Sequence, residues 1–397
     1  MSERQLKAWS QAGLIDAETA ERIRTWEAKN AKPLGLWALI GLGALAIGLG
    51  LVSVVAANWN EIPGTVRLGI HAALMAGLGG FIFWQRTQSG ARNSYFDDAA
   101  LFILATLGLT FFGHIGQVYQ TSSPLWQPFF AWMLLFTPLL LGYGRGWIVA
   151  AMWVAGLCFT SSQHWDWYMR TYYADVQTFG SVIDLGGNAD GPVRTPKWPY
   201  IYMGIVSATP AFAIALAAFT RSRSGRPDFW RKIEQLALVI TVLGISGFQL
   251  AYALGGNGYG ENVKVAVVQA ICLIAVAATV RVFRPTLSGT ATAGVLVCGA
   301  IMVILAPLVG RSELGGGILF MAFWGSIAAA ALYASWRLVF QAAVAVVAFR
   351  LIILSFELAS DLLGSGLGLI LAGVATLGIA WIAVRVSKRY APQEEDA

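Results

Sequence analysis

The sequence predicts an all-α, polytopic integral membrane protein with about 12 transmembrane helices in two parallel six-helix halves, preceded by a short cytoplasmic helical hairpin. Three observations lead to this prediction. Hydrophobic residues make up 57% of the 397 residues and charged residues only 12%, too few charges to cover the surface of a soluble protein of this size. Apolar runs of about 20 residues recur along the chain. Basic residues also concentrate in alternate connections between these runs.

Residues 1–33 precede the first apolar run and are predicted to form the hairpin. Gly13 is typical of the C-cap of a first short helix, and Asp16 is typical of the N-cap of a second. The segment holds six basic and five acidic residues, so we do not expect it to bind nucleic acid. It is too small to fold alone, and we expect it to pack on the inner membrane surface or on a partner protein.

Twelve apolar runs follow the hairpin. The first is too long for a signal peptide and is predicted to be a retained span. The fourth and fifth are the shortest and suit either a tilted pair or a re-entrant hairpin. The predicted spans are residues 34–57, 65–84, 96–113, 128–142, 146–160, 200–219, 234–254, 263–281, 290–309, 315–334, 338–357 and 364–386. Residues 387–397 are left as a cytoplasmic tail.

The basic residues predict the orientation of these spans. With the N-terminus in the cytoplasm, 20 of the 27 Lys and Arg residues fall in cytoplasmic segments and 6 fall in outer ones. Such an excess is typical of loops that stay inside, so both termini are predicted to be cytoplasmic. The segments 58–75 and 257–274 are each a polar outer turn leading into a span. This correspondence predicts two parallel halves, at residues 34–219 and 220–386.

Arg350 is the clearest candidate for a functional residue inside the membrane. It lies in the middle of the span 338–357, where a charge is costly, so we expect it to face the bundle interior and to be paired. Glu357 lies two turns further along the same face, and Gln249 and Gln269 are polar candidates on other spans. Arg350 is interpreted either as a contact for a substrate or anion, or as one member of a structural buried pair.

A charge-free polar segment, GHIGQVYQTSSP, follows the third span and contains His114 and Gln117. It is too apolar for a solvated loop and too polar for lipid, so we expect a re-entrant or cavity-lining segment. His114, and equally His71 within the second span, is either a proton carrier or a structural histidine held by hydrogen bonds.

The largest outer loop is predicted at residues 161–199, where six Trp and Tyr residues accompany four aspartates. Aromatic rings and carboxylates suit an enzyme that acts on a glycan, but interface anchoring explains the rings as well. No nucleotide-binding, hydrolase, metalloprotease or kinase motif is present in the sequence. No catalytic residue, metal site or cofactor is therefore predicted.

Four motifs give the chain a resemblance to a known family. GLIDAETAERI in the hairpin, a glycine-rich first span, AANWNEIP after it and GHIGQVYQ after the third span resemble the bacterial membrane family called domain of unknown function 2157. The resemblance covers about residues 1–150, and the rest is similar to the multi-span extension of longer members. It implies an inner-membrane protein with no assigned catalytic residue, and a small membrane-anchored partner protein.

Three functions are consistent with these observations. A carrier or flippase-like transporter is favoured by the parallel halves and the intramembrane arginine. A non-catalytic scaffold of a membrane complex is favoured by the small hairpin and the lack of motifs. An outer-face enzyme acting on a lipid-linked glycan is favoured only by the loop 161–199. Membrane lipids are the other expected partners, and a polar cavity within the membrane would favour the transporter.

Overall fold

The computed structural model describes residues 9, 12–30, 62–87, 94–172, 199–253, 263–309 and 313–358, with a few single residues between 373 and 385. All regular structure in these ranges is helical, as predicted. The chain divides into two compact units, residues 1–69 and 70–397.

The first unit contains the second helix of the predicted hairpin, α2 (Ala17–Asn30). Gly13 has a φ of 69°, and the amide of Leu14 donates to the carbonyl of Trp9, which is the geometry that ends a helix. Asp16 Oδ1 accepts a 2.8 Å hydrogen bond from the amide of Thr19 and so caps α2. Hydrogen bonds from the Thr19 side chain and amide hold the pKa of Asp16 below its usual value. Both predicted caps are confirmed.

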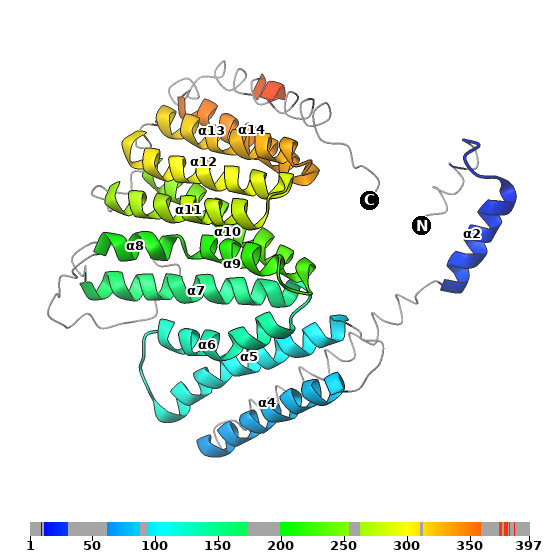
Figure 1. Ribbon diagram of the computed structural model, residues 1–397, viewed down its shortest axis with the longest axis vertical. Coiled ribbons are helices and arrows are strands. Elements are labelled where there is room, and N and C mark those ends of the chain that lie inside the picture. The colour runs from blue at the N-terminus through cyan, green and yellow to red at the C-terminus, as the bar shows by residue number, and fades with distance from the viewer. Residues whose placement is uncertain are drawn as a thin grey trace. The chain divides into compact units, whose positions relative to one another are not determined.

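The second unit is a stack of apolar helices (Figure 1). α4 starts in the first unit and continues into the second. The helices are α4 (Gly64–Thr87), α5 (Ser94–Tyr119), α6 (Trp126–Tyr143), α7 (Trp147–Tyr172), α8 (Pro199–Ser207), α9 (Thr209–Arg221), α10 (Pro227–Ala253), α11 (Val263–Phe283), α12 (Leu287–Val309), α13 (Glu313–Tyr333) and α14 (Arg337–Leu358). Ten of the predicted runs correspond to these helices. The runs 34–57 and 364–386 fall almost entirely outside the described residues.

The number of spans is lower than the twelve predicted when only the described residues are counted. Seven of their helices are long and apolar enough to cross a membrane, and the bent pair α8–α9 makes eight if it is one span. α6 and α7 do not count among these helices. α6 is short and carries Gln127 and two prolines, and polar residues such as Gln163 and Asp166 fill the second half of α7. The chain is a polytopic helical membrane protein, whereas the count of twelve stays a prediction.

The helix stack has two ends, which are called the Glu234 end and the Trp126 end. At the Glu234 end lie the connections 144–146, 222–226, 284–286 and 334–336. At the Trp126 end lie the connection 120–125, the C-terminus of α7 and the N-termini of α8, α11 and α13. α10 packs against α7, α9, α12 and α13, and α11 packs against α8, α9 and α12. These contacts make α10 and α11 the centre of the stack.

The connection 144–146 joins α6 to α7, and side chains from other helices hold it. Arg226 donates to the carbonyls of Leu141 and Gly144 at 2.7 and 2.6 Å, and Lys232 donates to the carbonyl of Arg145 at 2.7 Å. Asp98 accepts from the amide of Arg145 at 2.9 Å. The free carbonyls at the end of α6 thus find cationic partners, which favours the turn electrostatically.

Two predicted loop boundaries are wrong. The outer loop was expected from residue 161, but α7 continues to Tyr172 because hydroxyls such as Ser161 bond back to helix carbonyls and Asp166 pairs with Arg170 one turn later. The segment after the third span was expected to be irregular, but α5 continues to Tyr119. Polar residues end the apolar runs in the sequence, but the helices α5 and α7 continue through them. Their polar side chains bond to other groups of the protein and so do not interrupt the helix.

Candidate functional site

The predicted span 200–219 is a broken helix. α8 and α9 meet at Ala208 with a bend of 54°. Pro210 explains the break, because it has no N–H to donate to the carbonyl of Val206 and its ring crowds that carbonyl. The hydroxyl of Thr209 replaces the missing donor and bonds to the Val206 carbonyl at 2.7 Å. Broken helices within membrane proteins often border binding sites, since the interruption leaves room between neighbouring helices.

A cavity of about 230 Å³ lies at this break. Its walls come from α7, α8, α9, α10 and α11, and they include Cys158, Pro210, Phe248 and Val265. The lining residues of α10 and α11 lie within a few residues of the Trp126 end, so the cavity occupies that half of the stack. No lining residue carries a formal charge.

The hydrogen-bond acceptors of the cavity are the hydroxyls of Ser161, Ser162 and Ser207 and the amide oxygen of Gln269, whereas Trp165 and the NH2 group of Gln269 can donate. Each hydroxyl donates its proton to a carbonyl of its own helix, at 3.0, 2.8 and 2.9 Å respectively. The hydroxyl oxygens can therefore only accept further hydrogen bonds. Ser162 and Ser207 are exposed whereas Gln269 is buried, so the acceptors extend from the surface of the helix stack inward.

Gln269 is the deepest of these acceptors. It is 6% exposed, and its Oε1 is buried without a hydrogen-bond partner among the described residues. An unsatisfied buried amide oxygen costs about 1–3 kcal/mol, so such a group calls for a specific explanation. A ligand that donates a hydrogen bond in the cavity would supply the missing partner.

An aromatic cluster lies beside the cavity at the Trp126 end. The His164 ring packs against Trp126, Trp167 and Tyr202 with centroid separations of 4.6 to 5.4 Å, and Nδ1 of His164 is hydrogen-bonded to the Tyr202 hydroxyl. Asp166 is paired with Arg170 at 2.8 Å. These contacts hold His164 through its Nδ1 and Asp166 through Arg170. Asp175, Asp184 and Asp190 of the predicted loop lie outside the described residues.

Arg350 and Gln249 both approach a glycine-rich turn of α13. Arg350 is 6% exposed, and its Nη2 is 3.5 Å from the position of a Cβ on Gly317. Gln249 is 1% exposed and donates to the carbonyl of Gly316 at 2.5 Å. Close approach of α14 to Gly317 gives the guanidinium access to this turn. The side chain of Glu357, on the last turn of α14, lies outside the described residues.

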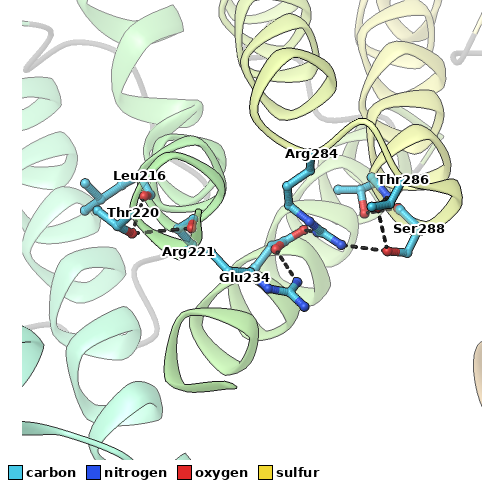
Figure 2. A network of polar contacts seen from close by, with 10 residues as sticks. Leu216, Thr220, Arg221, Glu234, Arg284, Thr286 and Ser288 are labelled. Carbon is cyan, nitrogen blue, oxygen red and sulfur yellow. Dashed lines mark hydrogen bonds and ion pairs between the residues drawn. The ribbon is translucent and has the colours of Figure 1, made fainter. Parts of the chain in front are cut away.

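A buried network of ion pairs lies at the Glu234 end (Figure 2). Glu234 of α10 is 4% exposed and lies between two arginines, Arg221 at the end of α9 and Arg284 in the connection before α12. Arg284 also donates to Ser288 at 2.6 Å. Burial lowers the pKa of Arg284, and the charge of Glu234 opposes that shift. The network joins three helices at the end of the stack opposite the cavity.

The two histidines singled out in the sequence meet in space. Nδ1 of His71 on α4 lies 2.8 Å from Nδ1 of His114 on α5, and Nε2 of His71 lies 2.9 Å from the carbonyl of Leu107. Gln117 is exposed on the next turn of α5. The structure thus brings together His71 with His114, and Arg350 with the turn that Gln249 binds. It places Gln269 apart from both, in the cavity.

Part of the chain matches a known family. Residues 7–149 match the model of a family described as a predicted membrane protein, DUF2157. The resemblance seen in the motifs is therefore confirmed over the segment that runs from the hairpin to the start of α7. The DUF2157 segment includes both His71 and His114 and precedes every residue that lines the cavity. Searches of curated proteins and of solved structures gave no match.

Most residues of the cavity are not indicated by any pattern in the sequence. Ser161, Ser162 and Ser207 were not singled out, because serines are common in membrane helices and their spacing carries no motif. A signal was nevertheless present in Pro210, which interrupts an apolar run near its middle. Gln269 was recognised as polar, but its lack of a partner is visible only in the structure.

Proposed function

We propose that this protein is a carrier that moves a small, neutral solute rich in hydrogen-bond donors across a bacterial inner membrane. The observation that supports it is the cavity at the break between α8 and α9, with the unpartnered Oε1 of Gln269 in its wall. The acceptors that line the cavity are uncharged, and they favour an uncharged solute that donates hydrogen bonds. An ion would lose its hydration shell on entering the cavity and would find no counter-charge there.

The size of the cavity narrows the substrate class. Its volume of about 230 Å³ is below the roughly 300–1,000 Å³ of sites for drug-sized ligands. At roughly 30 Å³ per water, it holds about eight water molecules. Small polyols, amides and ureas suit this space, whereas a lipid-linked glycan does not. A carrier is therefore favoured over both a flippase and an enzyme that acts on glycans.

The Glu234 network supports the same proposal. A carrier must close one side of its site while the other is open. The cavity lies toward the Trp126 end, and the ion network joins α9, α10 and the α11–α12 connection at the opposite end. In this proposal the network is the closed side. Binding to a small membrane-anchored partner and the division at residue 220 into two halves stay predictions.

The experiment uses the three native cysteines. Cys158 lines the cavity, whereas Cys272 and Cys298 do not. A variant that keeps only Cys158 is reconstituted in liposomes, and exchange of radiolabelled glycerol, urea and acetamide is measured. We expect exchange of at least one probe above that of empty liposomes. A small water-soluble thiosulfonate should label Cys158 and block this exchange.

Matched control variants distinguish an effect at the cavity from an effect elsewhere in the helix bundle. A variant that keeps only Cys298 should exchange the same probe and stay active after treatment with the thiosulfonate. Gln269→Leu should reduce exchange by tenfold or more while the protein stays folded, since it removes the deepest acceptor. Absence of exchange for all probes, with Cys158 unreactive from both sides, would contradict the carrier and favour the scaffold.

A further inference from the structure

The exposed surface of α9 is a narrow apolar stripe. α9 packs against α7, α10 and α11. In this helix, all of which the structure describes, the only exposed side chains are Phe212 and Leu216. These two residues, called the α9 stripe, lie one turn apart on one face, and Phe219 follows on the same face near the end of the helix. Because α9 belongs to the bent pair that is apolar enough to span a membrane, we expect the stripe to contact the acyl chains of lipids.

Arg223 lies beyond the end of this stripe and is held on two aromatic rings. Its guanidinium carbon is 4.0 Å from the ring centre of Phe219 on α9 and 5.7 Å from that of Phe283 on α11. The two rings pack edge to face, with their centres 5.0 Å apart. A guanidinium over the face of an aromatic ring is attracted by the ring electrons. The two rings therefore hold in place a long side chain that would otherwise sample many rotamers.

The guanidinium of Arg223 has no polar partner among the described residues. The residue is exposed, and its one hydrogen bond there runs from its backbone amide to the carbonyl of Thr220. The neighbouring arginines differ in this respect, since Arg221 is paired with Glu234 and Arg226 donates to two backbone carbonyls. Arg223 is thus a positioned cation whose N–H donors are available to a ligand.

The position of Arg223 along the helix stack matches the level of lipid headgroups. α9 ends at Arg221 and α11 ends at Phe283, and the candidate membrane spans end at the same two residues. The polar headgroups of a bilayer lie just beyond the ends of the apolar spans. A lipid whose acyl chains cover the α9 stripe would therefore place its phosphate beside Arg223.

The surrounding charge favours a lipid with a net negative charge. Residues 221–232 include five basic residues and one acidic residue, Asp228. Arg226 and Lys232 bind backbone carbonyls, which carry no formal charge, so both residues keep their positive charges uncompensated. Each basic residue near the membrane surface attracts anionic lipids, whereas a zwitterionic headgroup has no net charge to respond.

We propose that Arg223, held by Phe219 and Phe283, binds the phosphate of an anionic phospholipid whose acyl chains lie along the α9 stripe. The planar guanidinium binds two phosphate oxygens through parallel N–H···O hydrogen bonds. Because the rings already hold the side chain, little further rotamer entropy is lost on binding. The site lies on the lipid-facing surface and uses none of the residues that line the cavity, so it is independent of the carrier proposal.

The test measures lipid binding to the full-length protein by native mass spectrometry. Delipidated protein in detergent is titrated with phosphatidylglycerol or with phosphatidylcholine that has the same acyl chains, and the dissociation constant of the first bound lipid is determined. We expect phosphatidylglycerol to bind more tightly than phosphatidylcholine. Arg223→Gln should weaken binding of phosphatidylglycerol by about fivefold to tenfold and leave binding of phosphatidylcholine nearly unchanged.

Arg281→Gln is the matched control, because Arg281 is also exposed and lies two residues before Phe283, on a different side of α11. It should change the affinity for phosphatidylglycerol by less than about twofold. Both variants should unfold at the same temperature as the unaltered protein when no lipid is added. An equal loss of affinity in the two variants, or no loss in Arg223→Gln, would overturn the proposal. Displacement of phosphatidylglycerol by soluble glycerol 3-phosphate would assign the site to a free phosphate compound and would also overturn it.

Discussion

At the scale of single residues, buried polar groups in this helix stack are arranged in two ways. Glu234 and Gln249 are satisfied by neighbours, which is the usual outcome because an unpaired polar group away from water is costly. Gln269 Oε1 has no partner and lines the cavity. The other buried side-chain atoms without a partner in the described residues are the indole nitrogens of Trp126 and Trp230, which do not line it. In the carrier proposal, Gln269 therefore belongs to the solute-binding site.

The Glu234 network gives a prediction about which charge matters most. Glu234→Gln leaves Arg284 buried without a counter-charge, since the side chain of Arg284 is only 11% exposed. We expect a loss of about 3–5 kcal/mol in the free energy of unfolding, the usual cost of breaking a buried pair. Arg221→Gln should cost about 1 kcal/mol or less, because Arg221 is 25% exposed and the Glu234–Arg284 pair survives.

The measurement is the thermal stability of each variant in the same detergent. A clear ranking, with Glu234→Gln well below Arg221→Gln, is the expected result. Equal stability of the two variants would show that water already screens the network. It would then be unsuitable as the closed side of a carrier.

At the scale of helices, the structure confirms what apolar periodicity can predict and shows what it cannot. The runs 65–84 and 263–281 become α4 and α11 because an apolar stretch of that length buried in lipid must satisfy its backbone internally. The break at Pro210 and the continuation of α7 to Tyr172 were not predicted. Both depend on side chains that bond to particular carbonyls, and hydropathy contains no information about such contacts.

The sequence indicates some candidate residues better than others, because contacts between distant side chains are not visible in it. Arg350 is costly in any membrane helix, so its position in the sequence suffices to single it out. His71 and His114 are 43 residues apart, and only the structure shows that their rings are in contact. The cavity combines ordinary serines from two helices with a glutamine from a third, so no local pattern indicates it.

The packing of α8 on α11 allows a prediction for a whole helix. A Cβ on Gly204 would lie 2.5 Å from Cβ of Val268 and 3.0 Å from the carbonyl of Val265. Gly204→Ala should therefore push α8 away from α11 and cost about 1–3 kcal/mol of stability. Because α8 forms one wall of the cavity, probe exchange should fall as well.

Gly247→Ala is the matched control, since nothing lies within 4 Å of the added methyl group on α10. It should leave stability unchanged or raise it by up to about 1 kcal/mol, because alanine favours a helix. Thermal unfolding and probe exchange of the two variants are compared directly. If Gly204→Ala proved as harmless as Gly247→Ala, close packing of α8 on α11 would be refuted.

At the scale of the whole molecule, the distribution of charge follows the helix connections. The connections at the Glu234 end contain Arg145, Arg223, Arg226 and Arg284. At the Trp126 end, the described helix ends contribute only Arg170 and Lys264, together with Arg67 near the start of α4. Successive connections alternate between an end rich in basic residues and an end poor in them. This pattern is expected if the end rich in basic residues stays in the cytoplasm during membrane insertion. The Glu234 end is therefore predicted to face the cytoplasm.

Reporter fusions test this orientation and the even number of spans together. Alkaline phosphatase is active only outside the cytoplasm, and green fluorescent protein fluoresces only within it. Fusions at Gly225, in a connection at the Glu234 end, and at Ala397 should both fluoresce, because 20 of the 27 basic residues then lie inside. A fusion near Asn188, in the segment between α7 and α8, should give phosphatase activity instead. If Asn188 and Ala397 reported the same side, an odd number of crossings would separate Ala397 from Gly225, and the prediction of twelve spans with both termini inside would be wrong.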